Sequence, residues 1–405
     1  MGGNDGSAAP GEGVARGGGS SGPADSRGNG RRRVLVNALS AVIGGGITVA
    51  TRLAHQMATE HPEIAFVLLC THEEVADYGY PGNVEVLRRA DLGPRLARWR
   101  WEQMEQPTLL EERGIDVVLQ LGGYLCFRTQ VPQVAVWQNS NVFTPPGIPR
   151  PFSEELLVRA QRFVQGRSMR RAADNVFLTH NSVELCRRYW DMDAIDHTVI
   201  HSGVELPEGD PRASAPLSAR EPLAVTVGSA YAHKNIEAMI DAMACYADQN
   251  EDGLRLEIIG GAPSPDYFAS LEARIERLGL GDRVEMVGAL PMEAVHERMQ
   301  RARVYLVTSL LETFGLTLLE AMGNGLPVVA SNATCHPEVG GEAAVYCDPR
   351  DPEDVAKQLA RVVHDDDLAE QCRERGFEHL EAFSWSTSAT RYVEAIERAM
   401  GGTAR

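Results

Sequence analysis

The feature that most constrains this chain is an alternation of short apolar runs with amphipathic stretches, which occurs twice along the sequence. In the first half the apolar runs are Arg33–Asn37, Ile64–Cys70, Ile115–Leu121, Val134–Gln138, Val176–Thr179 and Thr198–His201. In the second half they are Leu223–Val227, Arg255–Gly260, Val284–Gly288, Val304–Val307, Pro327–Ala330 and Ala344–Tyr346. Strands that alternate with helices form βαβ units around a parallel sheet. We therefore predict an α/β fold of two Rossmann-like parallel-sheet domains that face a central cleft.

Composition marks the expected domain boundaries. Residues 1–30 are rich in Gly, Ser and charge and lack the apolar groups that offset ordering entropy, which predicts a disordered tail. Residues 206–222 are rich in Pro and Ala without periodicity, and are typical of a linker. The predicted domains are therefore residues 31–205 and 223–385, followed by a C-terminal helix within residues 386–405.

Charge and cysteine usage exclude several classes of protein. The formal net charge of −17 argues against a nucleic-acid partner, because phosphate binding needs an excess of Lys and Arg. The seven cysteines are an odd number without a CxxC pair, which favours a reducing compartment over a disulfide framework. The chain has no apolar run long enough to span a bilayer, and its first residues lack the hydrophobic region of a signal peptide. A cytoplasmic location is expected.

Two glutamates flank a Phe-Gly turn in the second half. The apolar run Val304–Val307 precedes them and predicts a buried strand, and Leu316–Met322 predicts a helix. Glu312 then lies on the loop after the strand, and Glu320 lies on the helix. The free amides at the helix start form an anion site that can hold a diphosphate. One of the two glutamates can then reach the hydroxyls of a sugar, and the other can reach a ribose. Spacing alone is also compatible with acids that only offset the helix dipole.

The wider segment 312–348 carries a family resemblance. It reads ETFGLTLLEAMGNGLPVVASNATCHPEVGGEAAVYCD. This resembles the donor-site signature of the retaining nucleotide-sugar glycosyltransferases of family 4, the glycosyl transferases group 1. The resemblance covers most of residues 33–400 and implies the GT-B fold. It also implies transfer of a hexosyl group from a UDP- or GDP-sugar to an acceptor hydroxyl with retention, without a metal ion or cofactor, in the synthesis of a glycan, glycolipid or glycosylated small molecule.

The resemblance assigns roles to individual residues. Glu312 would bind the hydroxyls of the donor sugar, and Glu320 would hold the ribose. Lys234 lies in a glycine turn after a strand, where an ammonium suits a diphosphate clamp. The remaining donor-binding positions are expected to be Gly45, Gly46, Gly228, Ser229, Gly260, Leu290, Phe314, Gly315, Leu316 and Thr317.

Two positions depart from the family pattern. Ser229 stands where the family usually has an arginine, so one of two expected cations at the diphosphate is missing. Gln138 stands where many members have a histidine, which removes a titratable group from a position that we assign to catalysis or acceptor binding. Either departure could alter leaving-group stabilisation or acceptor contact.

Other motifs carry less weight. Asp191-Met192-Asp193 has the shape of a metal-binding DxD motif, but it follows an amphipathic stretch and is expected at an exposed helix end, so no metal site is predicted. Cys335-His336-Pro337-Glu338-Val339 is expected to pack beside the donor loop, without a role for His336. The runs at 88–101 and 159–171 are basic, and the first is also aromatic. They suit either contact with the anionic inner face of a membrane or ordinary amphipathic surface helices.

Two other functions stay open. A nucleotide-sugar 2-epimerase of the same fold would release free nucleotide and sugar without an acceptor. A nicotinamide-dependent dehydrogenase is suggested only by the loop 44–46, which lacks the GxGxxG spacing and the acidic residue about 20 positions further on. The sequence does not identify the acceptor, which is a saccharide, a lipid-linked sugar or a small molecule.

Overall fold

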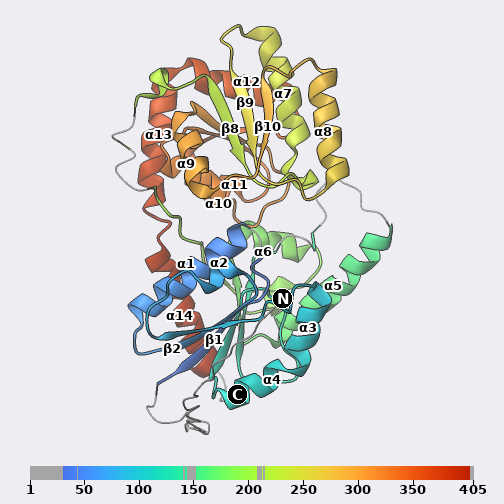
Figure 1. The fold of residues 1–405 in the computed structure, drawn as a ribbon, viewed down its shortest axis with the longest axis vertical. Coiled ribbons are helices and arrows are strands. Elements are labelled where there is room, and N and C mark those ends of the chain that lie inside the picture. The colour runs from blue at the N-terminus through green and yellow to red at the C-terminus, as the bar shows by residue number, and fades with distance from the viewer. Residues whose placement is uncertain are drawn as a thin grey trace, which may run out of the picture. The chain divides into compact units, whose positions relative to one another are not determined.

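The computed structural model describes residues 31–42, 44–139, 142–143, 152–207, 212 and 215–401, without the side chains of 152 and 153. The predicted tail of residues 1–30 and the middle of the predicted linker lie outside these ranges. The described chain forms two parallel sheets with helices packed around them (Figure 1).

The first sheet has seven strands in the order β3-β2-β1-β4-β5-β6-β7. They are β1 (Arg33–Ala38), β2 (Ala65–Cys70), β3 (Val84–Arg88), β4 (Val117–Gln120), β5 (Gln133–Trp137), β6 (Asp174–Phe177) and β7 (Thr198–Val199). The intervening helices are α1 (Gly45–Glu60), α2 (Glu73–Ala76), α3 (Arg95–Met104), α4 (Gln106–Glu112), α5 (Phe152–Arg171) and α6 (His180–Arg187). Strands β1, β2 and β4 to β6 are almost entirely buried, which explains their continuous apolar runs.

The second sheet has six strands in the order β10-β9-β8-β11-β12-β13. They are β8 (Leu223–Val227), β9 (Arg255–Ile259), β10 (Val284–Gly288), β11 (Val304–Val307), β12 (Val328–Ser331) and β13 (Ala344–Cys347). The helices are α7 (Ile236–Gln249), α8 (Pro265–Arg277), α9 (Met292–Arg301), α10 (Leu316–Gly323), α11 (His336–Gly340), α12 (Pro352–His364), α13 (Asp366–Leu380) and α14 (Trp385–Gly401).

Both sheets reverse their strand order beside their first strand. β1 pairs with both β2 and β4, and β8 pairs with both β9 and β11, always in parallel. This confirms the predicted fold of two parallel-sheet α/β domains. In such sheets, ligands bind outside the carboxyl ends of the strands at the point of reversal, so the loops after β8 and β11 are the place to look for a site.

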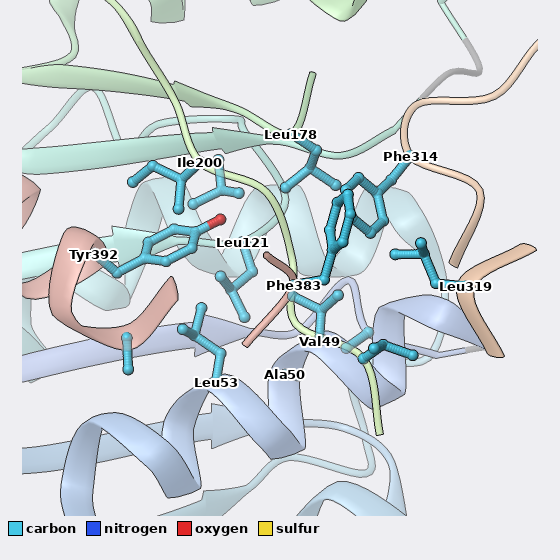
Figure 2. Close-up of a cluster of buried hydrophobic side chains, with 14 of the residues drawn as sticks. Val49, Ala50, Leu53, Leu121, Leu178, Ile200, Phe314, Leu319, Phe383 and Tyr392 are labelled. Atoms are coloured by element: carbon cyan, nitrogen blue, oxygen red, sulfur yellow. The ribbon is translucent and has the colours of Figure 1, made fainter. Parts of the chain in front are cut away.

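The last helix packs on the first sheet. α14 contacts α1 and strands β4, β5 and β6. Its Tyr392 is 1% exposed and lies near Leu53 of α1, Leu121 and Ile200 (Figure 2). Phe314, which follows Glu312 closely in the second half, lies in the same cluster beside Phe383 and Leu178 (Figure 2). One continuous apolar core therefore joins parts of both sheets.

Two local predictions differ from the structure, and the predicted linker contains one short ordered turn. β3 was not predicted, because it is a half-exposed edge strand whose alternating VEVLR pattern is short. Gly45 and Gly46 lie in the first turn of α1 and not in a loop, since the chain turns one residue earlier at Gly44, whose φ is 49°. In the predicted linker, Leu217 is fully buried within a 3₁₀ turn, Leu217–Ala219.

A glycine sets the packing where the chain leaves the first sheet. A Cβ atom on Gly203 would stand 2.4 Å from the backbone nitrogen of Trp385 and 2.5 Å from its Cγ. Next to it, the amide of Val204 donates to the carbonyl of Phe383 at 3.0 Å. We expect Gly203→Ala to lower the free energy of unfolding by about 1–3 kcal/mol, because the start of α14 must shift. Urea denaturation measures this change.

The matched control is Gly281→Ala, where an added Cβ would meet nothing within 4 Å. Equal urea midpoints for the two variants would contradict the packing argument.

Candidate active site

A buried ion pair lies where the loops after β8 and β11 meet. Lys234 ends a 3₁₀ turn, Ala232–Lys234, and its Nζ lies 2.5 Å from Oε1 of Glu312. The two side chains are only 22% and 15% exposed. Burial is the largest single influence and opposes both charges, but the partner's charge, the hydrogen bond between the two groups and other neighbouring groups together outweigh it. The pKa of Glu312 is therefore lowered and the pKa of Lys234 is raised. The two residues therefore stay ionised and in contact around neutral pH.

Thr334 fixes the backbone of Glu312. The amide of Glu312 donates to Oγ1 of Thr334 at 2.7 Å, and that hydroxyl donates to the carbonyl of Glu312 at 2.9 Å. Thr334 has a φ of 58°, a strained conformation for a β-branched residue. Strain of this kind persists where the surrounding structure demands it, which makes Thr334 a positioning residue of the site. The sequence analysis missed it because a backbone angle leaves no mark on the sequence.

The start of α10 offers backbone donors beside the ion pair. Gly315 precedes the helix with a φ of 81°, and a Cβ there would stand 3.1 Å from Cδ2 of His336. Within the described chain, the amides of residues 314–317 donate no backbone hydrogen bond to another residue. Free amides at a helix start, next to an ammonium, form a site for a negatively charged group.

His336 lies beneath this turn as a neutral group. Its side chain is 1% exposed, and burial lowers its pKa to about 4, with Glu312 acting in the opposite direction and Lys234 in the same one. Its Nδ1 has no hydrogen-bond partner among the described residues. The sequence analysis gave His336 no role, whereas the structure places it in contact with the turn and near both charged residues.

Glu320 lies on α10 and has no counter-ion among the described residues. Burial, and secondly the charge of Glu205, raise the pKa of its carboxyl to about 7. No hydrogen bond or ion pair joins that carboxyl to another described residue. A perturbed, unpaired carboxylate beside a binding loop is typical of a functional group. Its predicted contact with a ribose stays a prediction.

The glycine turns after β8, β9 and β10 are linked in a row. The amide of Gly228 donates to Ile259 and the amide of Gly260 donates to Gly288, each at 2.8 Å. A Cβ on Gly260 would stand 2.1 Å from the carbonyl oxygen of Gly228, so the two turns touch. Ser229 lies in the first of these turns, and Leu290 is half-buried after the third. The structure thus brings these predicted donor positions to one edge of the second sheet.

Gln138 is engaged with the backbone. Its Nε2 donates to the carbonyl of Leu121 at 2.7 Å, and its own carbonyl accepts from Oγ1 of Thr313 at 3.0 Å. The residue therefore joins the end of β5 both to the end of β4 and to the loop that carries Glu312. Its predicted role toward an acceptor stays a prediction, as do those of Gly45 and Gly46 at the start of α1.

Glu338 connects the two halves of the site. Its carboxylate accepts from the amides of His180 and Asn181 at 2.7 and 2.9 Å, which are the first amides of α6. Burial would raise its pKa, but these bonds and His201 lower it below the ordinary value. Thr313 adds to the connection, because its carbonyl accepts from the hydroxyl of Thr179 at 2.9 Å. The sequence analysis expected only packing from this turn.

Acidic side chains elsewhere among the described residues are not grouped as a metal site would require. Asp193 lies in a 3₁₀ turn, Met192–Ala194, and pairs with Arg187 at 2.7 Å. In the part of the chain that the structure describes, no three His, Cys, Asp or Glu residues are grouped as metal ligands would be. Nor does any described helix combine the length and apolarity needed to cross a membrane.

Comparison with known proteins identifies the segment that carries this site. Residues 210–379 match the family model of the glycosyl transferases group 1. The O-antigen chain mannosyltransferase B of Escherichia coli is 34% identical over 28% of this chain and 30% of its own length. The D-inositol 3-phosphate glycosyltransferase of Corynebacterium diphtheriae is 32% identical over 44% of this chain and 42% of its own. The chain thus matches less than half the length of these relatives.

Solved structures resemble the chain over most of its length. Sucrose-phosphate synthase of Thermosynechococcus elongatus superposes with a TM-score of 0.73 at 18% identity, covering 92% of this chain and all of that one. HepE of Anabaena, in complex with UDP and glucose, gives 0.68 at 17% identity, covering 91% and 100%. The likeness in structure establishes the fold, and the matches in sequence support a glycosyltransferase of the group 1 type.

The shifted pKa of Glu320 gives a pH-dependent prediction. Folding raises this pKa from 4.5 to about 7, so between these values the folded state holds a proton that the unfolded state has lost. The contribution of Glu320 to stability therefore falls as pH rises through this window. We expect Glu320→Gln to melt at a higher temperature than the unaltered protein above pH 7 and at the same temperature near pH 4.5. Thermal melts across this pH range measure the difference.

The control is Glu272→Gln on the exposed face of α8. A melting difference for Glu320→Gln that does not change with pH would contradict the inferred burial of its charge.

Proposed function

We propose that this protein is a retaining glycosyltransferase that moves a hexosyl group from a nucleoside diphosphate sugar to an acceptor hydroxyl without a metal ion. The observation that carries the proposal is the ion pair of Lys234 and Glu312 beside the free amides at the start of α10. One group of this pair can bind a diphosphate and the other can bind sugar hydroxyls. The match to the glycosyl transferases group 1 and the UDP and glucose bound in a similar structure support this choice of ligand.

Donor binding would replace the ion pair with two new sets of contacts. The diphosphate would take the ammonium of Lys234 and the amides of α10, which supply positive potential without a bound cation. Glu312 would then accept hydrogen bonds from the sugar hydroxyls, while Glu320 would accept from the ribose. In the transition state, negative charge grows on the departing diphosphate, so the fixed donors around it stabilise that state most.

The serine at position 229 leaves the stabilisation of the departing diphosphate mainly to one side chain. The family pattern places a second cation there, whereas a serine hydroxyl carries no charge. Lys234 is thus the side-chain cation that this turn supplies to the leaving group, aided by the helix amides. We infer that the leaving diphosphate depends more strongly on Lys234 than it would in a protein with both cations.

Product analysis tests the proposal. The protein is first screened by thermal shift against UDP-, GDP-, ADP- and dTDP-sugars, since a ligand at 100 times its dissociation constant stabilises by about 2.7 kcal/mol. With the donor that binds and a panel of acceptors, we expect proton NMR to show a glycoside with the anomeric configuration of the donor. We also expect the same rate in excess EDTA.

Three outcomes would overturn parts of the proposal. Free epimerised sugar and nucleotide, formed without an acceptor, would indicate the epimerase alternative. Loss of activity in EDTA that magnesium or manganese restores would contradict the metal-independent mechanism. An inverted anomer would contradict retention alone.

A double-mutant cycle tests the ion pair. We expect Glu312→Gln to lower kcat/KM by an amount equivalent to about 1.5–3 kcal/mol of lost transition-state stabilisation, because a charged hydrogen-bond acceptor is lost. Lys234→Met should weaken UDP binding as well, and the double variant should lose less than the sum because the two groups are in contact. Calorimetry with UDP and steady-state rates measure both effects.

Two controls accompany the cycle. Ser229→Ala alters the same turn without removing a charge, and should change UDP affinity less than Lys234→Met does. Glu342→Gln removes an exposed acid close to α11 and should change nothing. Unchanged UDP affinity in Lys234→Met would exclude the diphosphate clamp.

A further inference from the structure

Exposed apolar side chains gather on two helices of the first sheet. Six of the eleven large apolar side chains that are exposed among the described residues lie on α3 and α5. They are Leu96 (75%), Trp99 (41%) and Met104 (56%) on α3, and Leu156 (64%), Leu157 (66%) and Phe163 (75%) on α5. Such a concentration of exposed apolar groups marks an interaction surface more often than chance exposure does.

The outer face of α5 combines apolar and basic groups. Leu156, Phe163, Arg167 and Arg170 follow one another at helical spacing and so share a face. The opposite face is packed against the protein, because Val158, Gln165 and Met169 on that face are buried. A pocket on the outer face is lined by Phe163 and three arginines, Arg167, Arg170 and Arg171.

Five exposed arginines of α3 and α5 lack carboxylate partners among the described residues, although Arg159 and Arg162 of α5 pair with Glu155. The exposed side chains of Arg95, Arg100, Arg167, Arg170 and Arg171 make no ion pair with a described residue. Arg167 instead lies over the ring of Phe127 at 5.4 Å, and Arg171 donates to a backbone carbonyl. In a chain of net charge −17, a group of unpaired arginines forms a local positive region.

One short segment, residues 125–129, ties the two helices together. From α3, Nε2 of Gln103 donates to the carbonyl of Leu125 at 2.9 Å. From α5, Arg171 donates to the carbonyl of Thr129 at 2.9 Å, and Oγ of Ser168 accepts from the amide of Leu125 at 3.3 Å. α3 and α5 are drawn close together in the ribbon (Figure 1). Their exposed faces therefore belong to neighbouring elements, and we refer to them as the α3–α5 surface.

We propose that the α3–α5 surface docks on an anionic lipid bilayer. Its leucine, tryptophan and phenylalanine side chains suit the boundary between headgroups and acyl chains, and its arginines suit the lipid phosphates. The rest of the acidic chain is repelled by such a membrane, and this repulsion orients the protein with the α3–α5 surface toward the bilayer. This inference does not depend on the proposed glycosyl transfer.

Charge also argues against a second copy of the chain as the occupant. A two-fold contact places the same patch on both partners, so the arginines of one copy would face those of the other. Two copies of net charge −17 also repel each other as a whole. An anionic bilayer has the opposite sign to the patch and offers an apolar phase for the side chains between the arginines.

Vesicle sedimentation with the full chain tests the proposal. We expect co-sedimentation with vesicles of phosphatidylcholine and phosphatidylglycerol, and little with phosphatidylcholine alone. Binding should weaken when salt rises from about 0.05 M to about 0.5 M, because exposed charges are screened. A chain that stays in the supernatant with anionic vesicles at low salt would overturn the proposal.

Two variants separate the apolar and basic contributions. Leu156→Ser with Phe163→Ser removes apolar groups, and Arg167→Gln with Arg170→Gln removes charge. Each should weaken binding to anionic vesicles at least about tenfold, since both signals contribute to peripheral binding. The altered side chains are exposed, so melting temperatures should not change.

The matched control lies on the second sheet. Arg277→Gln with Leu278→Ser on and after α8 removes an exposed basic and an exposed apolar group in the same way. Vesicle binding lost equally in this control would contradict a specific surface. A dimer by light scattering that the Leu156 and Phe163 variant dissolves, without vesicle binding by the unaltered chain, would assign the surface to self-association instead.

Discussion

The candidate site depends on the hydrogen bonds that the carboxylate of Glu338 accepts. Glu338 lies on α11, two residues after His336, and its carboxylate accepts hydrogen bonds from two amides at the start of α6 in the first half of the chain. Hydrogen bonds to a charged group are worth about 1.5–3 kcal/mol each, more than neutral ones. With the carbonyl of Thr313 bound to the hydroxyls of Thr179 and Ser182, the loop after Glu312 is held directly to α6. The position of Glu312 is therefore set by residues of both sheets.

Three titratable groups within the site differ because their surroundings differ. Glu312 stays ionised because Lys234 neutralises it, Glu320 has its pKa raised to about 7 because burial has no opposing cation, and His336 is held neutral by burial. The paired charges of Lys234 and Glu312 cancel at a distance. The helix amides of α10 then supply the net attraction for an anion, and in the proposed function a diphosphate would have to compete only with a carboxylate for the ammonium.

The sequence predicted what depends on local pattern. Buried parallel strands are continuous apolar runs, so both sheets were found, and residues at their carboxyl ends, such as Lys234 and Glu312, were rightly expected at one edge of the second sheet. β3 was not predicted, because an edge strand is buried only at alternate positions and so lacks a continuous apolar run. Thr334 and Glu338 escaped for another reason. The role of Thr334 depends on a backbone angle, and the role of Glu338 depends on partners 157 and 158 positions away in sequence.

The packing of α14 on the first sheet has a consequence for synthesis of the chain. Tyr392 and its neighbours cover α1 and the ends of β4 to β6, which are made long before them. Domains generally fold from the N-terminus as the ribosome releases about 5–20 residues each second. Here the first sheet would emerge with an apolar face uncovered and wait some tens of seconds for its final helix. The order of translation thus leaves the first half exposed to chaperones until α14 has left the ribosome.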